Sequence, residues 1–181
     1  RIEDRFDILD VNMGCPVAKI VNNHEGSDLM NHPELAYEIL HAMVERCHKP
    51  VTVKFRKGFQ KTDDTAVEFA KMAEPYNIAW FEEPIHSADF NGIKKMKEMG
   101  VKQKISAGES MRISYMYEMY LEKGVDIVQP SLGRMTRIDD LLKIRDMARA
   151  AGKEFQSGGR TAYNASFGCL YAENERVEFH A

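Results

Sequence analysis

Residues 104–129, KISAGESMRISYMYEMYLEKGVDIVQ, contain a complete strand–helix–strand unit. Short apolar runs predict strands at Lys104–Ala107 and Asp126–Gln129, and the segment Arg112–Lys123 predicts a helix that ends before Gly124. Two strands joined through a helix form a βαβ unit, whose strands run parallel. This stretch therefore predicts a parallel α/β fold.

The same alternation extends over the rest of the chain, with strands that start about every 22 to 28 residues after the first unit. Seven strands are one short of a (β/α)8 barrel, and 181 residues are fewer than the ~250 typical of that fold. We therefore predict one truncated, TIM-barrel-like α/β domain over residues 1–181, with about seven parallel strands. The further predicted strands are Phe6–Val11, Val51–Phe55, Ile78–Phe81, Glu154–Ser157 and Val177–Phe179. The further predicted helices are Pro33–Cys47, Asp64–Glu74, Asp89–Met99, Ile138–Ala151 and Tyr163–Ala172.

Composition and charge restrict the class of protein. The net charge is −3 and the hydrophobic content is 44%, values that exclude a disordered chain and predict no general attraction to polyanions. No apolar run approaches the ~20 residues of a membrane span, so we expect no membrane partner. Cys15, Cys47 and Cys169 are odd in number and lack CxxC spacing, which indicates neither a disulfide framework nor a structural zinc site. We expect a cytoplasmic protein.

Acidic side chains follow several predicted strands. Catalytic residues of parallel barrels gather at the carboxyl ends of the strands. Glu82 and Glu109 stand at two such ends and Asp10 at a third, and carboxylate oxygens are the ligands that Mg²⁺ prefers. The alternative is that Glu82 or Glu109 forms an ion pair with Lys54 or Arg56.

Lys54 and Arg56 alternate along the predicted strand 51–55 and beyond, so we expect both side chains on one face. There they could meet a phosphate, a carboxylate substrate or Glu82. Cys15, on the loop Asn-Met-Gly-Cys-Pro, is either a tuned nucleophile or acid, or a small buried apolar residue.

The remaining histidines and aromatic residues predict ordinary structural roles. We expect the six histidines to be mostly surface residues, because no pair has the spacing of metal ligands. We expect the Met and Tyr side chains of residues 115–120 to pack within the fold.

Residues 6–71 resemble the tRNA-dihydrouridine synthases in the words DILDVNMGCPVAKIVNNHEGSDLM, KPVTVKFRKGF and AVEFAK. The resemblance implies an FMN-dependent oxidoreductase that reduces uridine in tRNA. It implies that Cys15 is the catalytic acid, that Asn12 contacts the RNA and that Lys54 contacts the flavin. Arg56 joins Asn12 and Lys54 as a candidate cofactor-binding residue.

Residues 75–178 resemble the carboxyl-terminal barrel of the enolase superfamily, in its mandelate racemase and acid-sugar dehydratase branch. The matching words are PYNIAWFEEPI, KISAGES, GVDIVQPSLGRMTRIDDLLKI and NASFGCLYAENERVEFH. The resemblance implies that Glu82 and Glu109 bind Mg²⁺. It also implies a lyase or racemase that abstracts a proton alpha to the carboxylate of a small acid-sugar substrate.

The two resemblances together indicate a chimera of residues 1–74 and 75–181. Asp10 and Asn12 then replace the enolase family's Lys-x-Lys acid/base pair, and Lys54 replaces an aspartate that binds the metal. We expect a Mg²⁺-dependent dehydratase or racemase that is impaired because these groups are missing, with Asp10 as the third ligand. The alternatives are an FMN-dependent enzyme acting on tRNA and an inactive barrel in which Lys54 pairs with Glu82 and Glu109. Two open sheet edges also predict a homo-oligomer.

Overall fold

The chain forms two compact units in the computed structural model, which describes residues 3–59 and 65–178. The first unit comprises Arg1–His86 and Met96–Lys104, and the second comprises Ser87–Lys95 and Ile105–Ala181.

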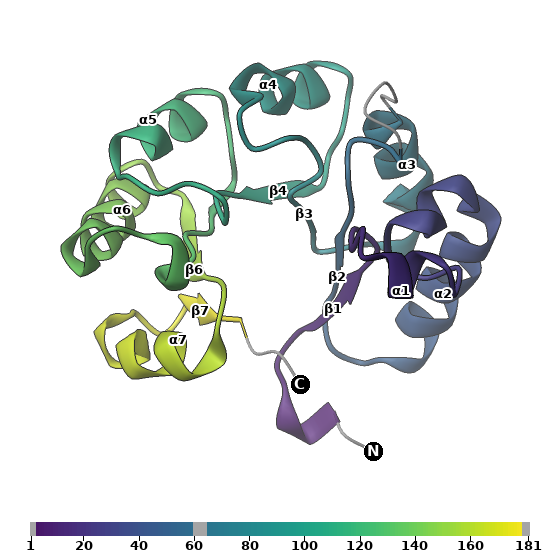
Figure 1. The fold of residues 1–181 in the computed structure, drawn as a ribbon, viewed down its shortest axis with the longest axis horizontal. Coiled ribbons are helices and arrows are strands. Elements are labelled where there is room, and N and C mark those ends of the chain that lie inside the picture. The colour runs from purple at the N-terminus through teal and green to yellow at the C-terminus, as the bar shows by residue number, and fades with distance from the viewer. Residues whose placement is uncertain (1–2, 60–64, 179–181) are drawn as a thin grey trace. The chain divides into compact units, whose positions relative to one another are not determined.

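The first unit contains three parallel strands in chain order, each followed by helical structure (Figure 1). Its strands are β1 (Leu9–Asn12), β2 (Val51–Lys54) and β3 (Trp80–Glu82). Its α-helices are α1 (Ala18–Val21), α2 (Pro33–Arg46) and α3 (Ala66–Ala73). Short 3-10 turns are η1 (Glu3–Arg5), η2 (Gly26–Asn31) and η3 (Glu74–Tyr76).

Aromatic side chains form the centre of this unit's core. The Phe55 ring lies 4.8 Å from that of Phe69 on α3 and 5.1 Å from that of Phe81 on β3, measured between ring centroids. Such tilted and edge-on contacts are favoured between aromatic rings. They join the helical layer to the strands and so fix the positions of the strand ends.

The second unit contains four parallel strands in chain order. They are β4 (Lys104–Ala107), whose first residue still belongs to the first unit, β5 (Ile127–Val128), β6 (Glu154–Ser157) and β7 (Arg176–Val177). The helices are α4 (Phe90–Glu98), which begins in this unit and ends in the first, α5 (Tyr115–Glu122), α6 (Ile138–Ala150) and α7 (Thr161–Phe167). Two 3-10 turns are η4 (Leu132–Arg134) and η5 (Gly168–Leu170).

Two buried tyrosines of α5 anchor the second unit. The Tyr117 hydroxyl donates a hydrogen bond to the carbonyl of Gly108 (2.7 Å), and the Tyr120 hydroxyl donates to that of Ser87 (2.7 Å). Gly108 has a φ of 128°, and a Cβ at this position would lie 2.6 Å from the Tyr117 ring. The predicted packing role of residues 115–120 is therefore confirmed for these two tyrosines.

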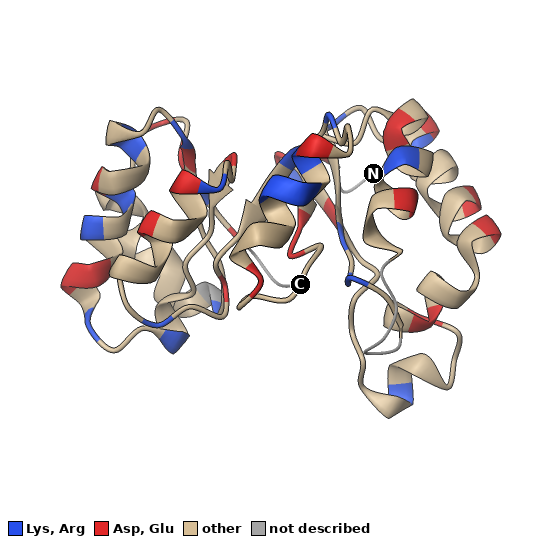
Figure 2. Ribbon diagram, turned by 90° about the horizontal axis from the view of Figure 1, so that it is seen from above, with Lys and Arg blue, Asp and Glu red and all other residues tan. Residues whose placement is uncertain are grey.

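The predicted series of about seven parallel strands in an α/β fold is confirmed. Strands β4 and β6 have the predicted bounds, whereas β1 begins at Leu9 rather than Phe6, because its pairing with β2 starts at Leu9 opposite Val51. Parts of two predicted elements, at Asp64 and Phe179, lie outside the described residues. Among the described helices, none is long and apolar enough to cross a membrane. Figure 2 shows acidic and basic residues interspersed along the helices.

Candidate functional site

Three of the predicted site residues end the strands of the first unit. The register pairs Asn12 of β1 with Lys54 of β2, and Lys54 with Glu82 of β3. Parallel strands in register bring their carboxyl ends to one edge of the sheet, so these side chains come from neighbouring backbone positions. The predicted gathering of polar residues at strand ends is thus present within this unit.

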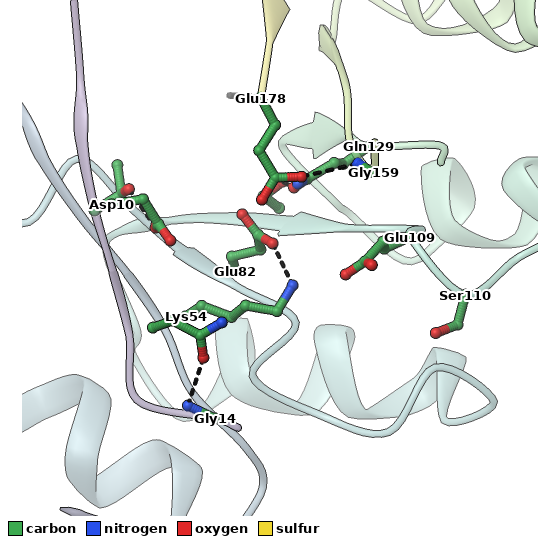
Figure 3. Close-up of polar contacts among 12 residues, drawn as sticks. Asp10, Gly14, Lys54, Glu82, Glu109, Ser110, Gln129, Gly159 and Glu178 are labelled. Atoms are coloured by element: carbon green, nitrogen blue, oxygen red, sulfur yellow. Dashed lines mark hydrogen bonds and ion pairs between the residues drawn. The ribbon is translucent and has the colours of Figure 1, made fainter. Parts of the chain in front are cut away.

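The Lys54 ammonium donates a hydrogen bond to the Glu82 carboxylate, forming an ion pair (Figure 3). Glu82 is only 3% exposed, and the Lys54 side chain is 20% exposed. A buried carboxylate is stable only where a partner compensates its charge, and Lys54 does so here. Of the two interpretations of Glu82, ligand of Mg²⁺ or partner of Lys54, the ion pair is the arrangement in this structure.

Asp10 lies on β1, two residues before its end, and accepts a 2.6 Å hydrogen bond from the hydroxyl of Thr52. Thr52 is its register partner on β2 and is buried. The assignment of Asp10 as a metal ligand stays a prediction.

The loop that carries Cys15 is fixed by hydrogen bonds on both sides. The Gly14 N–H donates to Oδ1 of Asn12 (3.0 Å), and the Met13 N–H donates to the Lys54 carbonyl (2.7 Å). Nε of Arg56 donates to the Gly14 carbonyl (2.6 Å). Cys15 itself is half-buried. Asn12 and Arg56, predicted to bind a cofactor, therefore hold this loop.

Lys54 and Arg56 were expected on one face of a single strand, but β2 ends at Lys54 and Arg56 lies in the following loop. The two cations consequently contact different groups, Glu82 and the Gly14 carbonyl.

Glu109 follows β4 and belongs to the second unit, whereas Asp10 and Glu82 belong to the first. Its carboxylate lies 3.6 Å from Nη2 of Arg134 on η4. Within its own unit, Glu109 therefore has a cationic neighbour, Arg134, which the sequence did not indicate. Its pairing with Lys54 or Arg56 stays a prediction.

A neutral hydrogen-bond network joins the strands of the second unit. Oε1 of Gln129 accepts from the Ser106 hydroxyl (2.6 Å) and from Nε2 of Gln156 (2.7 Å). All three residues are buried. Nearby, the Glu178 carboxylate accepts a 2.9 Å hydrogen bond from the Gly159 N–H (Figure 3). The sequence indicated Gln129 and Gln156 as polar strand-end residues but not Ser106 or Glu178.

The structure also brings together three side chains that the sequence analysis did not combine, namely His24, Asp28 and His32. Their spacing of four residues, repeated once, was the available signal. The histidines are exposed, as expected, but their nitrogens converge on one carboxylate oxygen of Asp28.

The enolase C-terminal domain-like family matches residues 5–181, nearly the whole chain. This chain belongs to that family. The match includes the segment 6–71, whose sequence resembles the dihydrouridine synthases, so the enolase-type assignment covers both units.

The resemblance to tRNA-dihydrouridine synthases appears among the curated relatives of this enolase C-terminal domain-like chain. The chain is 46% identical over 71 residues to tRNA-dihydrouridine synthase B of Proteus vulgaris, and the match covers 39% of this chain and 22% of that protein. It is 30% identical over 152 residues to a probable tRNA-dihydrouridine synthase of Rickettsia conorii, covering 75% of this chain and 45% of that one. The chain thus spans less than half the length of these relatives.

Solved structures confirm the barrel-type fold of this enolase C-terminal domain-like chain. A mandelate racemase/muconate lactonizing enzyme from Polaromonas sp. JS666 has a TM-score of 0.76 at 18% identity, covering 97% of this chain and 44% of that one. L-Talarate dehydratase from the same organism, complexed with Mg and L-glucarate, has a TM-score of 0.63 at 22% identity, covering 73% and 36% of the two chains.

Proposed function

We propose that this chain is an enolase-superfamily barrel domain in which the Lys54 ammonium, in place of Mg²⁺, balances the carboxylate of Glu82. The ion pair between these residues supports the proposal. A divalent cation binds carboxylate oxygens as a hard Lewis acid, and an ammonium group at the same carboxylate repels it. The residues around Glu82 therefore do not fit Mg²⁺, and the proposed function includes no step through the metal.

The candidate substrate is a small acid-sugar carboxylate, such as the L-glucarate bound to the Polaromonas dehydratase. Proton abstraction from such a substrate needs a base beside it. By resemblance, Asp10 and Asn12 stand where the family has its basic pair. Asp10 already accepts a hydrogen bond from Thr52, and the amide of Asn12 has no basic atom. We expect no measurable dehydration or racemisation of L-glucarate.

The decisive experiment is a Mg²⁺ titration of the parent chain and of Lys54→Asp. Thermal unfolding and calorimetry measure the binding of the metal. A ligand at ~100 times its dissociation constant stabilises the folded state by ~2.7 kcal/mol. We expect no stabilisation of the parent chain and a clear one of Lys54→Asp, whose new carboxylate joins Glu82. Lys102→Asp is the matched control, because Lys102 pairs with Glu74 (2.5 Å) at an exposed site of the same unit.

The outcome that contradicts the proposal does not depend on whether Lys54→Asp folds. If Mg²⁺ stabilises the parent chain and Glu82→Gln removes that stabilisation, Glu82 is a metal ligand despite Lys54. The Mg²⁺-dependent dehydratase or racemase would then be the better assignment, with Glu82 as a ligand.

A second candidate function is that of a flavin-dependent tRNA-dihydrouridine synthase, with Cys15 as the acid. The hydrogen-bonded loop Asn12–Cys15 favours it, because a general acid must be held in a fixed position. The cations assigned to FMN fit it less well, since Lys54 contacts Glu82 and Arg56 holds Gly14. Titration with FMN, followed by flavin fluorescence, and salt-dependent tRNA binding test this candidate. A chain that takes up neither FMN nor tRNA contradicts it.

Assembly through edge strands is a further part of the proposal. β1 and β7 each pair with one neighbour in the strand order, so each has an edge that a second copy could pair with. We expect sedimentation to show a homo-oligomer, and a monomer at all concentrations would contradict this part.

A further inference from the structure

His24, Asp28 and His32 form a compact cluster in the segment of the first unit that joins α1 to α2, and both histidines are exposed. Nδ1 of His24 lies 2.9 Å from Oδ2 of Asp28, and Nε2 of His32 lies 3.6 Å from the same oxygen. One potential ligand atom from each of the three side chains lies within 4.8 Å of the other two. Two nitrogens and one oxygen therefore converge on one point.

The two separations from the Asp28 oxygen are close to those between the ligands of a bound metal ion. Zinc binds histidine nitrogen and carboxylate oxygen at about 2.0–2.2 Å, and in a tetrahedral site two such ligand atoms lie roughly 3.3 Å apart. The distances of 2.9 and 3.6 Å lie on either side of this value. The imidazole planes are inclined at 85°, with ring centroids 5.6 Å apart, so the rings do not stack face to face.

The backbone holds the carboxylate in place before any ion binds. Asp28 lies in η2 and is buried, and Nδ2 of Asn31 donates to its other oxygen, Oδ1 (2.9 Å). Gly26 starts η2 with a φ of 60°, and a Cβ there would lie 2.5 Å from the Cys15 carbonyl. The adjoining Ser27 N–H donates to that carbonyl (2.9 Å). Outer-shell hydrogen bonds of this kind orient the ligands of metal sites.

The histidines, by contrast, are open to solvent, with side-chain exposures of 72% for His24 and 50% for His32. An ion from solution can reach both rings.

We propose that His24, Asp28 and His32 form a binding site for a transition-metal dication, Zn²⁺ above all. Two imidazole nitrogens and one carboxylate suit Zn²⁺ and exclude selective binding of Mg²⁺, which takes oxygen ligands. Three protein ligands leave a fourth position for water. This site is separate from Glu82 and does not depend on the proposed function.

The test is calorimetric titration of the chelator-treated full chain with Zn²⁺ in the presence of excess Mg²⁺. We expect one site, and we expect Co²⁺ at that site to give the visible absorption of a low-symmetry complex. The variants are His32→Gln and His24→Asn, each of which removes one imidazole. Asparagine suits position 24 because it tolerates the left-handed φ of 60° found there.

The matched control is His41→Gln on α2. His41 lies 3.2 Å from Glu45 four residues later, also at the surface, and this histidine–carboxylate pair belongs to no three-ligand cluster among residues 3–59 and 65–178. We expect a loss of Zn²⁺ affinity of at least about ten-fold in both cluster variants and none in His41→Gln. Unchanged affinity in both cluster variants, or an equal loss in all three, would overturn the proposal. Circular dichroism verifies that each variant is folded. If His32→Gln does not fold, the result for His24→Asn decides the test.

Discussion

The two units place polar side chains at their strand ends by different chemistry. In the first, the Lys54 ammonium neutralises the buried carboxylate of Glu82. In the second, the neutral side chains of Ser106, Gln129 and Gln156 bond to one another. Both arrangements lie on parallel strands of the same fold family, so the fold alone does not decide which is used.

The difference has an energetic consequence. A buried ion pair recovers little net stability, but each partner is costly to leave alone because its charge is then uncompensated. A neutral network loses less when one member is removed, since only desolvated dipoles remain unpaired. The first unit's pair is therefore the more vulnerable arrangement.

The largest expected effect is that of Lys54→Met. The substitution leaves Glu82 buried without a cation, and we expect the free energy of unfolding to fall by about 3 kcal/mol. Urea denaturation at neutral pH measures it.

The double variant Lys54→Met/Glu82→Gln removes the stranded charge and should recover part of this loss. Lys102→Met is the control, because Lys102 and its partner Glu74 form an exposed pair, and we expect its loss to change the free energy of unfolding far less than Lys54→Met does. A Lys54→Met chain as stable as the parent would show that Glu82 does not need its cation, and the contrast between the units would disappear.

Removing the Ser106 hydroxyl should have a smaller effect. It donates to Gln129 (2.6 Å) and accepts from Nε2 of Gln156 (3.0 Å). We expect Ser106→Ala to cost about 1.5 kcal/mol, with little dependence on salt because no charge is involved. Ser110→Ala, at an exposed residue 3.4 Å from Arg134, is the control and should change stability by less than about 0.5 kcal/mol. If Ser106→Ala lowered the free energy of unfolding more than Lys54→Met does, the neutral network would be the more vulnerable of the two arrangements.

Local sequence signals predicted the elements well. Pro33 occupies the first turn of α2, and Gly124 and Gly152 follow α5 and α6 with φ values of 91° and 66°. These positions depend on the residue's own backbone preferences, which the sequence contains. The strand-end location of Lys54 and Glu82 followed from the same alternation.

Contacts between distant residues were harder to predict. The sequence left Glu82 with two interpretations, because choosing between a metal and Lys54 requires the register of β2 and β3. The four-residue spacing of His24, Asp28 and His32 was visible in the sequence, but it was not recognised as a cluster because these residues do not lie on one continuous α-helix. A left-handed residue and a 3-10 turn separate its members, and their side chains meet through that irregular path.

The smallest effect concerns an ion pair in the second unit and tests whether that unit depends on charge at all. Nε and Nη2 of Arg149 donate to the two oxygens of Glu175 (2.6 and 2.8 Å). Burial raises the pKa of Glu175, but hydrogen bonds from Arg149 and from the Ala172 N–H outweigh it and hold the pKa below the ordinary 4.5. Because the folded pKa is the lower one, the stabilisation is complete above pH 4.5 and is lost as pH falls through the folded pKa.

We expect Glu175→Gln to lower the free energy of unfolding by about 1 kcal/mol at pH 7, since Arg149 is partly exposed. The difference from the parent should shrink below pH 4.5. Thermal unfolding of both chains between pH 3 and pH 7 measures the difference, where about 1 kcal/mol corresponds to a shift of a few degrees. A constant difference across this range would mean that Glu175 acts through packing rather than through its charge.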